Sequence, residues 1–284
     1  MIHVIIPVYN RIEYTVRCIN SLEKQAVKDK LNIIVVDDCS SDNTKNILIK
    51  QFPHVKILTG TGLLFWGGAV SYAIDHVLQN SKSNDWVLLV NNDVELSNDT
   101  ISKLIEFSES NNRKVITSAL TLDLNDKQTI IKSGTIVESW FFNKTRHILN
   151  GLNINQLKNK EPIKVHFLTG RCVLHPIEVF KIAGNYDSKT FLHYGGDDEF
   201  SMRVKKFDYS TFVYPKSLVY LNLNEQKKKK KLNHKRFLFV FFNIKSSSNI
   251  LNKFRLSIKI VPFYAKLSFF LIGVLKSLYI FFKK

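Results

Sequence analysis

Short runs rich in Val and Ile alternate with longer amphipathic stretches over the first 120 residues, and this alternation restricts the fold more than any other feature. Such apolar runs indicate buried strands, which are expected at residues 4–8, 32–36, 55–58, 86–90 and 115–119. The stretches between them indicate helices, which are expected at residues 13–25, 42–51, 68–80 and 98–111. This order of elements forms βαβ units, so it predicts an α/β fold with a mostly parallel sheet flanked by helices.

The pattern continues less regularly to about residue 225. One strand is expected at residues 165–168, helices at 176–183 and 197–207, and closing strands at 213–215 and 218–221. The net charge of +17 belongs mainly to the C-terminal segment, because residues 226–284 have 15 Lys and Arg residues and no Asp or Glu. We therefore expect a domain over residues 1–225 and a basic C-terminal tail over residues 226–284.

The tail combines its charge with apolar runs at residues 237–242 and 267–282. The second run has 16 residues, fewer than the roughly 20 that span a bilayer. Basic amphipathic helices are typical of attachment to an anionic membrane surface, which is the partner predicted for the tail. A helical hairpin that forms a homo-oligomer is a second interpretation. No nucleic-acid partner is expected, because no recognisable nucleic-acid module accompanies the tail.

The N-terminus and the cysteines indicate a compartment. The chain begins with a strand-like run that lacks the basic and long apolar regions of a signal peptide. Cys18, Cys39 and Cys172 form no metal-binding or disulfide pattern, so they are expected to be small buried hydrophobic residues in a reducing compartment. These features predict a cytoplasmic protein that is peripheral at the inner face of the cell membrane.

Two acidic clusters follow predicted strands, at the sheet edge where ligands bind in α/β proteins. Asp37 and Asp38 can accept hydrogen bonds from a nucleotide, or they can cap the next helix. Asp93 follows Asn91 and Asn92 and offers an oxygen ligand to a divalent cation, although such triplets also form ordinary turns.

A third acidic cluster opens the predicted helix at residues 197–207. Asp197, Asp198 and Glu199 follow two glycines and lie where the helix dipole favours negative charge. A carboxylate held there can act as a general base toward a hydroxyl group.

The order and spacing of these clusters resemble the motifs of the inverting family 2 glycosyltransferases, which have the GT-A fold. The segments that carry the resemblance are Ile5-Ile-Pro7-Val-Tyr9-Asn10, Val36-Asp37-Asp38, Gly62 through Ala69, Asn91-Asn-Asp93, Leu168-Thr-Gly170 through Asp187, and Gly196-Asp197-Asp198-Glu199-Phe200 through Arg203. The resemblance as a whole covers about residues 1–225. Bacterial enzymes that build surface polysaccharides, including rhamnosyltransferase-like members, are the most similar.

The resemblance implies specific roles for these residues, with Mg²⁺ or Mn²⁺ as cofactor. Asp93 would bind the metal, and Asp197 would be the catalytic base, with Asp198 as the alternative. Trp66 and Gly170 would lie on the acceptor side. Donor binding would involve Pro7, Val8, Tyr9, Asn10, Asp37, Asp38, Gly67, Gly68, Asn91 and Asn92, with Tyr9 beside the base and the two glycines allowing close backbone approach.

The sequence departs from the family pattern at Asn91, where the metal motif usually has Asp, and at Gly196, where the base motif usually has Glu. His193 and His234 are interpreted as structural or solvated. The implied activity is sugar transfer from a UDP- or dTDP-sugar to a glycan acceptor, lipid-linked in this interpretation, by metal-assisted inverting displacement. A nucleotidyltransferase and a non-catalytic membrane-bound scaffold are the alternatives.

Overall fold

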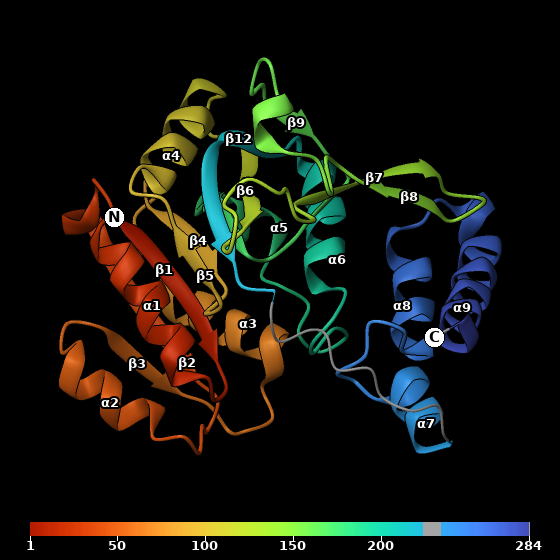
Figure 1. Ribbon diagram of the computed structural model, residues 1–284, viewed down its shortest axis with the longest axis horizontal. Coiled ribbons are helices and arrows are strands. Elements are labelled where there is room, and N and C mark those ends of the chain that lie inside the picture. Colours follow the sequence, from red (N-terminus) through yellow and green to blue (C-terminus); the bar gives the residue numbers. More distant parts are fainter. Residues whose placement is uncertain (224–233, 284) are drawn as a thin grey trace.

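The computed structural model describes residues 1–223 and 234–283 (Figure 1). The expected domain boundary at residue 225 and the basic run at residues 227–231 lie outside the described residues. The strands are β1 (Ile2–Val8), β2 (Leu31–Asp37), β3 (Lys56–Thr59), β4 (Trp86–Val90), β5 (Val94–Leu96), β6 (Val115–Asp123), β7 (Gly134–Ser139), β8 (Lys144–His147), β9 (Ile163–Lys164), β10 (Phe167–Leu168), β11 (Cys172–Pro176) and β12 (Ser210–Leu221). The α-helices are α1 (Ile12–Glu23), α2 (Thr44–Gln51), α3 (Phe65–Leu78), α4 (Thr100–Ser110), α5 (Glu178–Ala183), α6 (Gly196–Arg203), α7 (His234–Phe242), α8 (Ile250–Ile260) and α9 (Lys266–Lys283).

The central sheet confirms the predicted α/β fold, but it is mixed rather than mostly parallel. Its strand order is β3-β2-β1-β4-β11-β6-β12-β5, and β9 pairs with β12. The pairs of β1 with β2 and β4, of β2 with β3, and of β6 with β12 are parallel. β11 lies antiparallel between β4 and β6, so the sheet changes direction near its centre. A second sheet contains β10, β7 and β8.

Most differences from the sequence expectations lie after residue 120, although the short strand β5 before that point was not expected either. β11 was not expected. Of the strand expected at 165–168, only Phe167–Leu168 forms a strand, β10 of the second sheet, whereas β9 of the central sheet (Ile163–Lys164) precedes the expected range. The two expected closing strands are one strand, β12, whose register shifts between Tyr214 and Leu218. All three cysteines are free, and Cys39 is exposed rather than buried.

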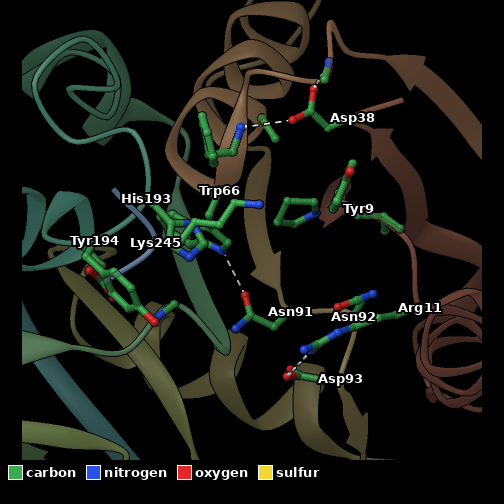
Figure 2. A pocket seen from close by; sticks show the side chains of 17 residues that line it. Tyr9, Arg11, Asp38, Trp66, Asn91, Asn92, Asp93, His193, Tyr194 and Lys245 are labelled. Carbon is green, nitrogen blue, oxygen red and sulfur yellow. Dashed lines mark hydrogen bonds and ion pairs between the residues drawn. The ribbon is translucent and has the colours of Figure 1, made fainter. Parts of the chain in front are cut away.

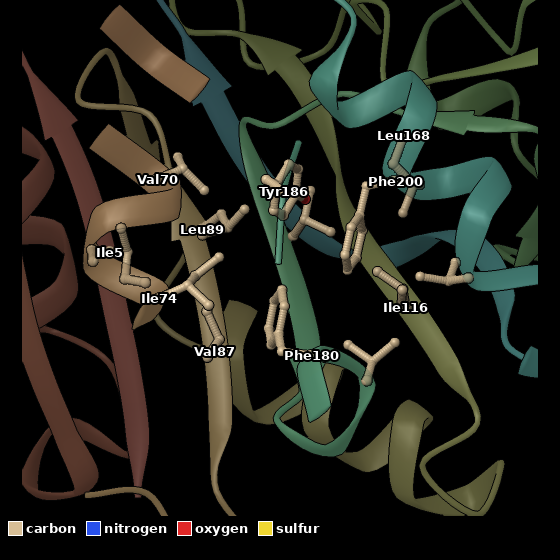
Figure 3. Close-up of a cluster of buried hydrophobic side chains, with 14 of the residues drawn as sticks. Ile5, Val70, Ile74, Val87, Leu89, Ile116, Leu168, Phe180, Tyr186 and Phe200 are labelled. Atoms are coloured by element: carbon tan, nitrogen blue, oxygen red, sulfur yellow. The ribbon is translucent and has the colours of Figure 1, made fainter. Parts of the chain in front are cut away.

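Two hydrophobic cores cover the two faces of the sheet. One contains α3, α5 and α6, and the other contains α1 and α4. Figure 3 shows Val70 and Ile74 of α3 beside the strands and an aromatic group nearby. In that group the Tyr186 and Phe200 rings stack with centroids 4.3 Å apart. Because Phe200 belongs to α6, this stacking fixes the helix that carries Asp197 against the sheet.

Of the tail helices, α8 contacts α6 and α9 contacts the β7–β8 hairpin (Figure 1). Arg255 of α8 donates a hydrogen bond to the Thr190 carbonyl oxygen at 3.0 Å, and Lys259 forms an ion pair with Asp187. At the hairpin, Asn143 Nδ2 donates to the Phe269 carbonyl oxygen of α9 at 2.8 Å. The tail is therefore packed onto the loop that precedes α6.

Candidate active site

A pocket of about 520 Å³ lies at the carboxyl ends of β1 and β4 (Figure 2). The loop after β1, the loop after β4, the start of α3 and the segment entering α6 supply its walls. Two-thirds of the residues singled out in the sequence lie on these walls: Pro7, Val8, Tyr9, Asp38, Trp66, Asn91, Asn92, Asp93, Gly170 and Asp197. Segments distant in the sequence thus meet at the sheet edge where the strand-end rule places a ligand.

Asn10 and Asp37 were expected at the donor, but neither residue lines the pocket. The Asn10 side-chain oxygen accepts a hydrogen bond from the Ser41 backbone N–H at 2.8 Å. The buried Asp37 carboxylate accepts one from the Ser40 backbone N–H at 2.9 Å. These bonds order the loop after β2 and connect it to the loop after β1.

Gly67 and Gly68 also do not line the pocket, and the structure gives a packing reason for Gly67. Its backbone N–H donates to the Leu192 carbonyl oxygen at 2.7 Å. A Cβ at this position would overlap the Phe191 carbonyl oxygen. Gly67 therefore allows α3 to approach the segment before α6 closely, instead of allowing the donor to approach.

Asp38 organises the entrance to α3. Its carboxylate accepts hydrogen bonds from the backbone N–H groups of Gly62 at 2.7 Å and Phe65 at 3.0 Å (Figure 2). Each oxygen retains further lone pairs for a ligand. The same carboxylate therefore shapes the loop and faces the pocket.

Asp93 is the best candidate for a metal ligand. One of its oxygens lies 3.6 Å from Arg11 Nη1, and the other is buried without a hydrogen-bond partner. Asn91 accepts a hydrogen bond from Trp66 Nε1 at 2.9 Å. Residues 1–223 and 234–283 contain no group of three or more His, Cys, Asp and Glu side chains that could hold a metal. The residues therefore fit a hard cation only if a bound ligand supplies most of its oxygens.

Asp197 and Asp198 occupy different environments at the start of α6. Asp197 lines the pocket, and its carboxylate accepts hydrogen bonds from the backbone N–H groups of Gly170 at 3.3 Å and Asp198 at 3.2 Å. Burial raises the pKa of Asp197 despite these bonds and the nearby Arg171 charge. Burial, and then the Asp197 charge, raise the pKa of Asp198 well above its usual value. Since Asp198 does not line the pocket, Asp197 is the better placed of the two.

The Trp66 ring packs directly on Gly170, where an added Cβ would lie 2.5 Å from the indole. This contact holds the start of α3 against the loop between β10 and β11.

Seven wall residues were not among the individual site residues predicted from the sequence, although three of them lie in the segment from Gly62 to Ala69 that carries the family resemblance. They are Arg11, Gly62, Phe65, Ala69, His193, Tyr194 and Lys245. His193, interpreted from the sequence as structural or solvated, has a buried Nδ1 atom without a partner. Burial lowers the pKa of His193, and the Lys245 charge lowers it further. The neutral ring therefore has a polar atom available inside the pocket. The only sequence signal for His193 was its position two residues before the pair Gly195 and Gly196. No sequence signal indicated Lys245.

Comparisons with known proteins agree with this architecture. The profile of the family described as "Glycosyl transferase family 2" matches residues 3–181. The chain therefore belongs to glycosyl transferase family 2. The uncharacterized glycosyltransferase MG060 of Mycoplasma genitalium is 28% identical over 113 residues, and its homolog in Mycoplasma pneumoniae is 32% identical over 114 residues. These matches cover 37% and 38% of this chain and 36% of each relative.

Solved structures show the same GT-A fold at low identity. GalNAc-T7 with UDP, GalNAc and Mn²⁺ aligns with a TM-score of 0.61 and 17% identity, over 95% of this chain and 53% of that one. The mannosyltransferase PcManGT from Pyrobaculum calidifontis, in complex with GDP-Man and Mn²⁺, aligns with a TM-score of 0.60 and 12% identity, over 98% of this chain and 73% of that one. S. aureus TarS residues 1–349 with UDP-GlcNAc aligns with a TM-score of 0.58 and 16% identity, over 91% of this chain and 66% of that one.

Proposed function

We propose that this protein transfers a sugar from a nucleotide-sugar donor, UDP- or dTDP-linked, to a hydroxyl group of a glycan acceptor. The observation that carries the proposal is the convergence of Tyr9, Asp38, Asp93 and Asp197 on one pocket. The family and the nucleotide-bound neighbours support it. A lipid-linked acceptor and a place in surface-polysaccharide synthesis belong to the same proposal, supported by the basic and apolar character of the tail.

In this proposal the reaction is a direct displacement that inverts the anomeric carbon. Asp197 accepts the proton of the acceptor hydroxyl while that oxygen forms a bond to the anomeric carbon. The bond from this carbon to the diphosphate breaks, and its electron pair leaves with the nucleoside diphosphate. A divalent cation held by Asp93 would offset the charge that develops on the diphosphate. Tyr9 and Asp38 hold the nucleoside so that the sugar faces Asp197.

Removing the Asp93 carboxylate tests the donor site. We expect wild-type protein with Mn²⁺ or Mg²⁺ to bind and slowly hydrolyse one donor in a panel of UDP-, dTDP- and GDP-sugars. Asp93→Ala and EDTA should each weaken binding by about tenfold or more, because either change removes charge compensation at the diphosphate. Calorimetry and nucleotide release measure the two effects.

A well-folded wild-type protein that binds no donor would contradict the proposal and favour the non-catalytic scaffold. Release of diphosphate from a nucleoside triphosphate, with no use of a nucleotide sugar, would favour the nucleotidyltransferase.

We further propose that the tail docks on the inner, anionic face of the cell membrane. The tail carries many exposed aromatic and aliphatic side chains. Among them, Phe263 is 91% exposed and Leu267 is 71% exposed. The exposed rings of Phe141 and Phe142, on the hairpin that contacts α9, extend this surface. Lysines on the same helices favour anionic lipid.

The apolar segment is longer than the 16 residues expected from the sequence. Phe263–Lys283 forms 21 helical residues, and an 18-residue window within it has a mean hydropathy of 1.7 with 22% of that window buried. By length and composition alone this helix could cross a bilayer. No other helix of the described residues is both long and apolar enough to do so.

Point variants test the membrane proposal without removing helices that pack on α6. Replacing Phe263 and Leu267 together by Ser should lower the partition coefficient for phosphatidylglycerol-containing liposomes, measured by flotation, by about a hundredfold or more, since each buried side chain contributes about 1.5–3 kcal/mol. Ile49→Ser, on exposed α2 far from the tail, is the matched control (Figure 1).

Unchanged flotation of the double variant would contradict membrane docking. Loss of a dimer in sedimentation, with flotation unchanged, would identify this surface as the homo-oligomer contact.

A further inference from the structure

The tail contributes one side chain to the candidate active site. Lys245 lies between α7 and α8 and lines the pocket, and Figure 2 shows its side chain extending toward the side that carries Tyr9. Its ammonium group lies 5.4 Å from the centre of the Tyr9 ring and 5.5 Å from that of Phe65. A residue far from the donor motifs in sequence therefore lies among them in space.

The turn that carries Lys245 is held by its own hydrogen bonds. The Asn243 side-chain oxygen accepts from the Lys245 backbone N–H at 2.8 Å, and Asn249 Nδ2 donates to the Asn243 carbonyl oxygen at 3.1 Å. The buried Ser246 hydroxyl donates to the Val240 carbonyl oxygen at 2.6 Å. The backbone at Lys245 is thus ordered, which reduces the entropy lost when its side chain binds a ligand.

The tail also packs directly on the segment that carries the proposed base. A Cβ added at Gly195, the residue that precedes α6, would lie 3.2 Å from the Leu256 side chain of α8. Arg255 and Lys259 hold the same segment through Thr190 and Asp187. These contacts hold the tail, and with it Lys245, in a defined position at the pocket.

Lys245 differs from these neighbouring tail cations in its partners. Three of those cations contact carbonyl or carboxylate oxygens within residues 1–223, namely Arg255, Lys259 and Lys276. No ion pair joins Lys245 to a carboxylate within residues 1–223 and 234–283, and its ammonium faces two aromatic rings instead. Contact with aromatic faces stabilises a cation by only about 0.5–1 kcal/mol at exposed sites, so a phosphate oxygen is a stronger partner.

We propose that Lys245 is a donor-binding residue whose ammonium group pairs with the diphosphate of the nucleotide sugar. This inference rests on the proposed function and assigns part of that site to the tail. Lysine suits the role because it is a compact charge on a flexible chain. Its positive charge offsets the negative charge that the leaving nucleoside diphosphate gains. This added charge compensates in part for Asn91, which removes one carboxylate from the metal side.

The test compares ligands with and without a diphosphate on the full-length protein. Dissociation constants are measured for UDP, dTDP and GDP by calorimetry, and for the matching nucleosides by ligand-observed NMR. Lys245→Gln should weaken binding of the preferred nucleoside diphosphate by about ten- to a hundredfold, as expected for loss of a charged hydrogen bond. Binding of its nucleoside should change by less than about twofold, because the contact is to phosphate.

Two further variants make the result specific. Lys245→Arg should recover part of the affinity, since it retains the charge with a different geometry. Lys266→Gln removes the same charge from the start of α9, away from the pocket, and should leave nucleotide affinity unchanged.

Equal weakening of nucleoside and diphosphate, or an equal loss in Lys266→Gln, would overturn the role of Lys245 while leaving the donor site intact. Wild-type affinity for the diphosphate in Lys245→Gln would do the same. Failure of the wild-type protein to bind any of the three diphosphates would overturn the proposed function as well.

Discussion

Replacing Asp197 by Asn is expected to lower the rate of donor turnover by about 10²–10⁴-fold, the contribution that general-base catalysis typically makes. The amide has nearly the same shape as the carboxylate, but it cannot accept the proton of the attacking hydroxyl or water. Donor affinity should remain within a few-fold of wild type, because in the proposed mechanism Asp197 acts on the acceptor hydroxyl and not on the nucleotide. Turnover is measured as nucleoside diphosphate release at saturating donor, and affinity by calorimetry.

Asp198→Asn is the matched control for this result. Burial and the neighbouring Asp197 charge raise the pKa of Asp198 well above its usual value, so Asp198 holds a proton in preference to Asp197. An amide replaces a neutral acid at little cost, and turnover should fall by less than about tenfold. In wild type, the rate should decrease as the pH falls through the raised pKa of Asp197, because protonation removes the base. A larger loss in Asp198→Asn than in Asp197→Asn would assign the base to Asp198.

Gly67→Ala is expected to destabilise the protein by about 3 kcal/mol, toward the upper end of the cost of overpacking a core. The added Cβ would overlap the Phe191 carbonyl oxygen and lie 3.0 Å from that of Leu192. Both are backbone atoms, which cannot yield by a simple side-chain rotation. Movement of this segment also displaces His193 and Asp197, so turnover should fall together with stability. Urea unfolding followed by circular dichroism gives the free energy of unfolding.

Gly68→Ala provides the comparison at the next position of the same helix. Its nearest contact would be the Leu64 Cβ at 3.3 Å, which belongs to a side chain. Alanine favours a helix over glycine by about 1 kcal/mol, and this gain offsets the tight contact. We expect a change of less than about 1 kcal/mol in the free energy of unfolding. Equal destabilisation by both substitutions would show that the close approach of α3 to Phe191 is not the reason for glycine at position 67.

Much of the fold could be predicted where structure depends on local patterns. The run at residues 86–90 coincides with β4, and the helix expected at 98–111 contains α4. Buried strands need continuous apolar residues, and helices need apolar residues on one face, so both leave a local signal. The motif order also placed Asp38, Asp93 and Asp197 in one pocket. The strand-end rule accounts for Asp38 and Asp93, which follow the parallel strands β2 and β4.

The mixed sheet could not be predicted in the same way. Cys172–Pro176 is a short buried strand whose pairing partners, β4 and β6, lie far away in the sequence. Its direction follows from those long-range hydrogen bonds rather than from its composition. The β7–β8 hairpin likewise lacks a strong apolar pattern, because all four residues of β8 are exposed.

The sequence by itself determined the α/β class, the family and the carboxylates of the site, because these depend on periodicity and on motifs within short segments. The tertiary structure decided which residues line the pocket together. It placed Gly67 against the backbone of Phe191 instead of on the pocket, left Asp198 off the pocket wall, and brought Lys245 of the tail beside Tyr9. These assignments depend on packing between segments that lie far apart in the chain, and such packing leaves no mark in any one segment.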